Sequence, residues 1–76
     1  MSTYSYGQFE MLLRKSGFLR TRTGDHNLWE RTGPNGKVER VILCSRALRP
    51  IPTQVLPRLL QHAGLTEEAL RGSSRP

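Results

Sequence analysis

The fold is decided by residues 18–44, which read FLRTRTGDHNLWERTGPNGKVERVILC. Three segments of this stretch mix polar with branched or aromatic side chains, as half-buried strands do, and they are residues 18–23, 27–31 and 38–43. Residues 24–25 (GD) and 33–36 (GPNG) supply the turns between them. Because a parallel pair of strands needs a long crossover, segments joined by turns this short must form an antiparallel meander.

A helix is expected before the meander. Ser5 and Gln8 have the spacing of a capping box, and apolar residues at helical spacing follow them. Basic residues and then Gly17 mark the end of this pattern. We therefore predict the first helix over residues 6–16.

A second helix is expected after the meander and a basic loop. Because Pro57 belongs in a first helical turn, this helix should begin at Thr53 or Gln54, and Gly64 should end it. Thr66 can cap a short final helix.

The order of these elements predicts an α+β fold of the type α-β-β-β-α, the order also found in double-stranded-RNA-binding domains. Each helix has one apolar stripe and the sheet needs one covered face, so both helices should pack on the same face of the three-stranded antiparallel sheet. The other face should stay open. We expect a single domain over residues 1–71 and a flexible tail over residues 72–76.

Composition and charge narrow the class of partner. The chain has 76 residues and a formal net charge of +6 at pH 7, and ten of its twelve cations are arginine, which favours forked recognition of phosphates or carboxylates. A small basic domain indicates a nucleic acid or an acidic protein as its partner. There is no apolar run long enough to span a bilayer, and Cys44 is the single cysteine, so we expect a cytoplasmic protein with no membrane partner, in which Cys44 is a small core residue.

His26 is the residue best suited to chemistry. It follows a turn and lies close in sequence to Arg20, Arg22 and Arg31. An imidazole titrates near neutral pH, so it can take the proton of an RNA 2′-hydroxyl or protonate the leaving oxygen, while fixed cations stabilise the charge on phosphorus. The 2′-hydroxyl is an internal nucleophile, so this reaction needs no metal and no cofactor. The alternative is a turn histidine that only hydrogen-bonds the backbone.

Four short motifs carry a resemblance to a known family, and they are LLRKSGF at residues 12–18, GDH at 24–26, PNG at 34–36 and LPRLLQHAGL at 56–65. In this order and spacing, and over most of the chain from Gln8 to Leu70, they resemble the HicA family of bacterial toxin–antitoxin toxins, which are small ribonucleases that cleave mRNA. The resemblance implies a double-stranded-RNA-binding-like fold, His26 as the catalytic residue, and a HicB-like antitoxin protein as partner.

Two positions depart from the family pattern. Asp25 stands where the family has serine, and it could either support the imidazole or repel phosphate. Residues 42–45 read ILCS where the family often has a second histidine. The resemblance therefore implies an enzyme with a single catalytic histidine.

Further residues are candidates for binding RNA. Four arginines could hold phosphates, and they are Arg20, Arg22, Arg46 and Arg49. If Leu28 belongs to the core, Trp29 lies on the open face of the sheet and could stack on a base or on an antitoxin side chain. If the register differs by one residue, Trp29 belongs to the core instead.

These features favour a metal-independent endoribonuclease toxin. One alternative is a non-catalytic RNA-binding module of the same fold, in which His26 only contacts a 2′-hydroxyl. Another is a protein that only occupies an antitoxin.

His62 precedes Gly64 by two residues, so we expect it to stabilise a helix C-terminus. The two histidines, His26 and His62, lack the spacing of a metal site.

Overall fold

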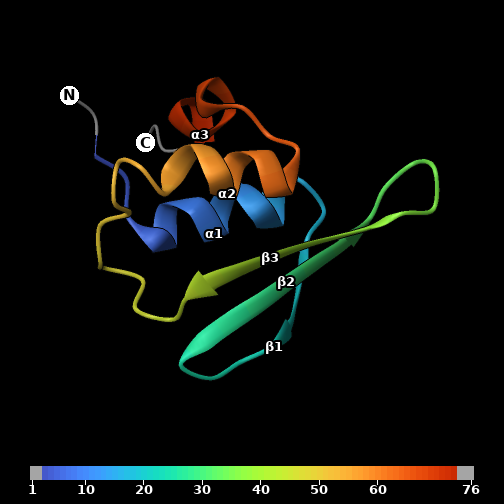
Figure 1. The fold of residues 1–76 in the computed structure, drawn as a ribbon, viewed down its shortest axis with the longest axis horizontal. Coiled ribbons are helices and arrows are strands. Elements are labelled where there is room, and N and C mark those ends of the chain that lie inside the picture. The colour runs from blue at the N-terminus through green and yellow to red at the C-terminus, as the bar shows by residue number, and fades with distance from the viewer. Residues whose placement is uncertain (1–2, 74–76) are drawn as a thin grey trace.

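The computed structural model describes residues 3–73 of the chain (Figure 1). Its elements follow the order α1 (Tyr6–Lys15), β1 (Leu19–Arg22), β2 (His26–Thr32), β3 (Val38–Cys44), α2 (Leu56–Ala63) and α3 (Glu67–Ser73). The predicted α+β class is confirmed, because the strands form an antiparallel sheet in the order β1-β2-β3. Within the described residues, no helix is long and apolar enough to cross a membrane.

Local signals in the sequence set the start of α1 and the turn between β2 and β3. The Ser5 hydroxyl accepts a hydrogen bond from the Gln8 backbone N–H (3.2 Å), and the Gln8 side chain accepts one from the Ser5 N–H (2.7 Å), so the capping box is confirmed. In the turn, Gly36 adopts a φ of +81°, which only glycine takes readily. The turn closes with a hydrogen bond from the Gly33 N–H to the Lys37 carbonyl (2.7 Å).

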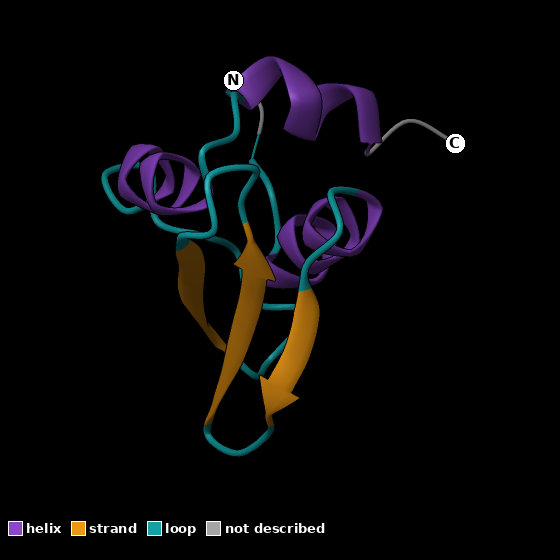
Figure 2. Cartoon of the chain, turned by 90° about the vertical axis from the view of Figure 1, so that its right-hand side faces the viewer, coloured by secondary structure: helices purple, strands orange, loops and turns teal. Residues whose placement is uncertain are grey.

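Both main helices lie on the same side of the sheet, as predicted (Figure 1). The helix-facing side of the sheet contributes Trp29, Val41 and Leu43 to a core that also contains Phe9 and Leu13 of α1. Figure 2 shows the three strands side by side, with the turn that joins β1 to β2 far from the helices. The opposite face of the sheet is open to solvent.

Register decides which residues face the core. Trp29 pairs with Val41 and is only 1% exposed, whereas the neighbouring pair of Leu28 and Ile42 points to the open face, where Ile42 is 62% exposed. Of the two alternatives for Trp29, the structure has the core position. The reason is volume, because burying the indole removes more apolar surface from water than burying Leu28 would.

The second helix starts later than predicted. Regular α-helix begins at Leu56 rather than at Thr53 or Gln54, after a turn in which the Val55 N–H donates to the Pro52 carbonyl (2.9 Å). The Leu56 N–H also donates to the Pro52 carbonyl (3.2 Å), but Pro57 has no N–H to donate to the Thr53 carbonyl. The series of helical hydrogen bonds is therefore interrupted at Pro57 and becomes continuous only after it.

The final helix is capped as predicted. The Ala69 N–H donates to the Thr66 hydroxyl (3.1 Å) at the start of α3. The helix includes Gly72 and Ser73, the first two residues of the predicted tail, and residues 74–76 lie outside the described part of the chain.

Candidate functional site

His26 is the first residue of β2, and its side chain is exposed. It pairs with Cys44 of β3, and in antiparallel strands such partners point to the same face. Because Leu28 and Ile42 are on the open face, the same alternation places His26 and Cys44 there as well. The imidazole is therefore available to a partner that approaches the open side of the sheet.

The turn before His26 is tied to the end of β3. The Ser45 N–H donates to the Asp25 carbonyl (3.2 Å), which extends the pairing of β2 with β3 by one residue pair. Asp25 itself is exposed. This hydrogen bond fixes His26 beside the loop that follows β3.

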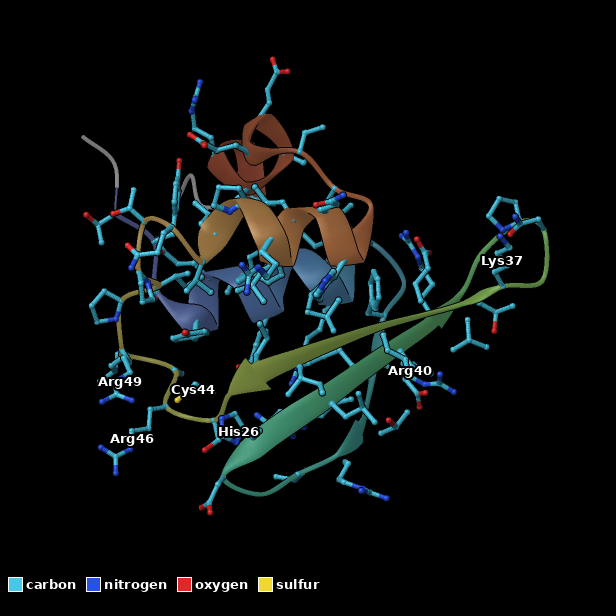
Figure 3. All side chains as sticks on the ribbon, in the orientation of Figure 1. His26, Lys37, Arg40, Cys44, Arg46 and Arg49 are labelled. Atoms are coloured by element: carbon cyan, nitrogen blue, oxygen red, sulfur yellow. The ribbon has the colours of Figure 1, made fainter. Side chains whose placement is uncertain are left out.

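That loop carries Arg46 and Arg49, both exposed. Figure 3 shows them at the same end of the molecule as His26 and Cys44, while Lys37 lies at the far end of the sheet. The Arg49 N–H donates to the Arg46 carbonyl (3.1 Å), which closes a turn between the two arginines. The structure thus brings together His26 and two of the four arginines predicted to hold phosphate.

The loop is docked on the N-terminus of α1. The Gly7 N–H donates to the Ala47 carbonyl (2.8 Å), and the Tyr6 N–H donates to the Arg49 carbonyl (3.0 Å). A Cβ on Gly7 would lie 3.1 Å from both the Cβ and the carbonyl oxygen of Ala47, so a glycine is needed for this close approach. Two orphan amides of the helix start therefore hold the basic loop in place.

The other two predicted arginines lie on β1 and point to opposite faces. Arg20 pairs with Trp29 and belongs to the helix-facing side, with its guanidinium 6.0 Å from the centroid of the indole. A bulge after Arg20 shifts the register, so that Arg22 pairs with Leu28 and belongs to the open face. Arg22 therefore shares a face with His26, and Arg20 does not.

Trp29 cannot stack on a base in this structure, so that prediction is wrong. The ring is buried, and its indole N–H donates to Oε2 of Glu10 (3.2 Å). The same oxygen accepts a hydrogen bond from the Asn27 side-chain amide (3.0 Å). Glu10 thus anchors two inward-pointing side chains of β2, a role that the sequence pattern did not indicate.

Cys44 was expected in the core, and its position is also different from that prediction. It is only half-buried and lies opposite His26 on the open face. The sequence contained the signal for its position opposite His26, because a turn that pairs Thr32 with Val38 also pairs residue 26 with residue 44.

Farther along the open face, Glu30 and Arg40 form an ion pair (2.6 Å). Hydrogen bonds from Arg40 and then from Thr21 lower the pKa of the Glu30 carboxyl below its ordinary value. Arg40 is therefore already engaged with a carboxylate, which sets it apart from Arg46 and Arg49.

His62 lies in the last turn of α2, at the helix end where it was predicted. It is exposed and belongs to the helical layer, so it does not join His26. Among residues 3–73, no three His, Cys, Asp or Glu side chains gather as a metal site would require.

No protein-family model matches this chain, and no curated protein matches it.

Proposed function

We propose that this protein is a metal-independent endoribonuclease toxin of the HicA type, which cleaves mRNA and is neutralised by a HicB-like antitoxin. The observation that carries the proposal is the position of His26: an exposed imidazole at a strand start, hydrogen-bonded through its neighbouring turn to a docked loop that presents Arg46 and Arg49. A general acid or base beside fixed cations is what cleavage of an RNA phosphodiester requires.

The proposed reaction is an internal transfer at phosphorus. His26 takes the proton of the 2′-hydroxyl, the 2′ oxygen forms a bond to phosphorus, and the bond from phosphorus to the 5′ oxygen breaks. Water protonates the leaving 5′ oxygen. In the reverse assignment His26 protonates that oxygen and water accepts the 2′ proton. Both leave a 2′,3′-cyclic phosphate and a 5′-hydroxyl, and both make use of one imidazole.

Arg46 and Arg49 are proposed to bind the phosphate groups. Their guanidinium groups form no ion pair within the described residues, so they are available to an anion. Because the amides of α1 hold the backbone of their loop, that backbone needs little reordering when RNA binds, and cations positioned in advance stabilise the charge on phosphorus. Arg22 adds a cation on the same face of the sheet.

The proposed antitoxin covers the open face. Leu19, Val38 and Ile42 are exposed there around the ion pair of Glu30 and Arg40, so the face offers a protein partner both apolar and charged contacts. A partner seated on these residues would also cover His26, which shares the face. Binding of the antitoxin would then block access of RNA to the imidazole.

Cleavage of RNA in the presence of a chelator tests the proposal. The wild-type chain should cut single-stranded RNA in EDTA and leave cyclic-phosphate ends, and His26→Ala should abolish the cut. His62→Ala is the matched control, since it removes an exposed imidazole from the helical layer and should leave the rate unchanged. Equal rates for wild type and His26→Ala would refute the catalytic assignment.

A non-catalytic RNA-binding module of the same fold is the second candidate. It is favoured by one observation, that His26 and His62 lie in different layers, so no second histidine completes an acid–base pair. A pure binder should leave RNA intact while its affinity falls steeply with salt. Expression in bacteria separates the two: the enzyme should arrest growth through His26, and co-expression of its antitoxin should restore growth.

A further inference from the structure

The hollow between α1 and β1 is lined by Arg14, Phe18, Leu19, Arg20 and Trp29, and its volume is about 230 Å³. It lies on the helix-facing side of the β1 edge, away from His26. Nothing in the proposed catalytic site uses it. Two arginines line this recess together with three apolar side chains.

The two guanidinium groups are held over the same aromatic ring. The Cζ of Arg14 lies 5.5 Å from the centroid of Trp29, and the Cζ of Arg20 lies 6.0 Å from it. Both distances fall within the range of a cation–π contact. Both exposed guanidinium groups therefore contact the buried indole ring of Trp29, and the hydrogen bond from this indole to Glu10 fixes the orientation of the ring.

Neither cation is neutralised. Within the described residues, the ion pairs involve Arg31, Arg40 and Arg71, and neither Arg14 nor Arg20 takes part in one. Glu10 is the nearest carboxylate along α1, but its Oε2 already accepts hydrogen bonds from Trp29 and Asn27. Two unpaired positive charges held at one recess repel each other, and an anion between them would relieve that repulsion.

The bulge in β1 connects this recess to the open face. Without it, Arg20 and Arg22 would point to the same side of the strand, since they are two residues apart. The bulge instead places Arg20 over Trp29 and Arg22 beside Leu28, on the face that carries His26. The cations therefore continue around the exposed edge of β1 from one face of the sheet to the other.

We propose that the recess formed by Arg14 and Arg20 is a second phosphate-binding point for the RNA strand, which passes around the edge of β1 to reach His26. The inference rests on the proposed function for its ligand, and it assigns Trp29 the role of positioning two guanidinium groups. A forked guanidinium binds the two free oxygens of a phosphodiester in parallel, so two of them can hold one phosphate from both sides.

Binding of a single-stranded oligodeoxynucleotide tests the inference without any cleavage, because this ligand has no 2′-hydroxyl. Trp29 is the single tryptophan of the chain, so its fluorescence reports directly on the recess. The wild-type protein should show a change in this fluorescence on binding. Arg14→Gln and Arg20→Gln should each weaken binding on the order of fivefold at low salt. Each should also lower the slope of log affinity against log salt by about 0.7.

Arg58→Gln is the matched control. Arg58 is exposed on α2 and its loss changes the net charge equally, so it should change affinity less than about twofold if position matters and not charge alone. Equal losses in Arg58→Gln and Arg14→Gln would overturn the inference. If a glutamine variant does not fold, as judged by circular dichroism, Arg14→Lys and Arg20→Lys keep the charge but lose the fork, and they should still weaken binding measurably.

Poly-glutamate and inorganic phosphate serve as further probes. If Arg14→Gln and Arg20→Gln lose affinity for poly-glutamate but bind the oligonucleotide as the wild type does, the recess is a site for an acidic protein. That result would overturn the inference. Competition by inorganic phosphate with recovery of the free-state fluorescence supports it. If the recess does not bind the oligonucleotide, the proposal that His26 cleaves RNA still stands. If the protein binds the oligonucleotide at the recess but does not cleave RNA, the recess proposal stands and the proposed enzymatic function is refuted.

Discussion

Replacing Arg31 by alanine should remove a side chain that joins both main helices to the sheet. The guanidinium donates to the Ser16 carbonyl at the end of α1 (2.7 Å) and to the Ala63 carbonyl at the end of α2 (3.3 Å). It also forms an ion pair with Glu39 (2.8 Å) and lies 4.5 Å from the centroid of the Phe18 ring. One cation thus satisfies the last carbonyls of two helices and favours both helix dipoles.

The expected loss of stability follows from these contacts. The Arg31 and Glu39 side chains are 25% and 29% exposed, so solvent screens their ion pair to roughly 0.5–1 kcal/mol. The two carbonyl bonds contribute about 1 kcal/mol each, and the contact with the Phe18 ring adds about 0.5 kcal/mol. Alanine should therefore cost about 3 kcal/mol, a large share of the roughly 5–10 kcal/mol that stabilises a domain of this size.

Urea denaturation followed by the fluorescence of buried Trp29 measures the loss. Arg31→Ala should lower the denaturation midpoint without changing the slope of free energy against urea, and its thermal midpoint should fall on the order of 15 °C. Glu39→Gln is the matched control, because it removes the ion pair and leaves both carbonyl bonds. It should cost less than about 1 kcal/mol.

If Glu39→Gln is as destabilising as Arg31→Ala, the hydrogen bonds to the helix-end carbonyls contribute nothing and the role given to Arg31 is refuted. A loss below about 1 kcal/mol in Arg31→Ala would refute it as well. Arg31→Lys should fall between wild type and alanine, because a single ammonium cannot reach all of the acceptors that the fork bridges.

Two further changes and one control variant test other parts of the fold. The pKa of Glu30 is lowered by its hydrogen bond with Arg40, so this contact stabilises the fold above the ordinary carboxyl pKa of 4.5 and is lost as the pH falls through the lower, folded-state pKa. Below pH 4.5, the thermal midpoint of Glu30→Gln should therefore fall less steeply with decreasing pH than that of the wild type. The same dependence on pH in both proteins would contradict this. Gly64→Ala should cost roughly 1–2 kcal/mol in urea denaturation, because Gly64 has a φ of +66° and a Cβ there would lie 3.0 Å from a carboxylate oxygen of Glu39. Gly72→Ala, with nothing within 4 Å of its Cβ, should be neutral or slightly stabilising.

At the candidate site, the sequence predicts which residues of β2 and β3 pair with each other, but it does not predict which face of the sheet the helices cover. The position of His26 opposite Cys44 follows from the turn at residues 33–36, which lies wholly within the meander. Strand alternation placed Leu28 and Trp29 on opposite sides correctly, but alternation alone is symmetric and does not say which side the helices cover. The prediction that Trp29 binds RNA failed for that reason.

The sequence by itself determined the local structure of this protein. The capping box of Ser5 and Gln8, the left-handed turn at Gly36 and the cap at Thr66 each depend on residues within four positions of one another, so neighbouring side chains are enough to specify them. The order of helices and strands follows from these signals.

The tertiary structure decided what the open face presents. Trp29 points inward and packs in the core with residues of α1. A bulge in β1 places Arg22 on the same face as His26, whereas Arg20 lies over the indole ring. The loop with Arg46 docked on the amides of α1, which lie far from it in the sequence. These outcomes depend on which arrangement buries the most apolar volume and satisfies the most backbone groups at once, and only the assembled chain sets that balance.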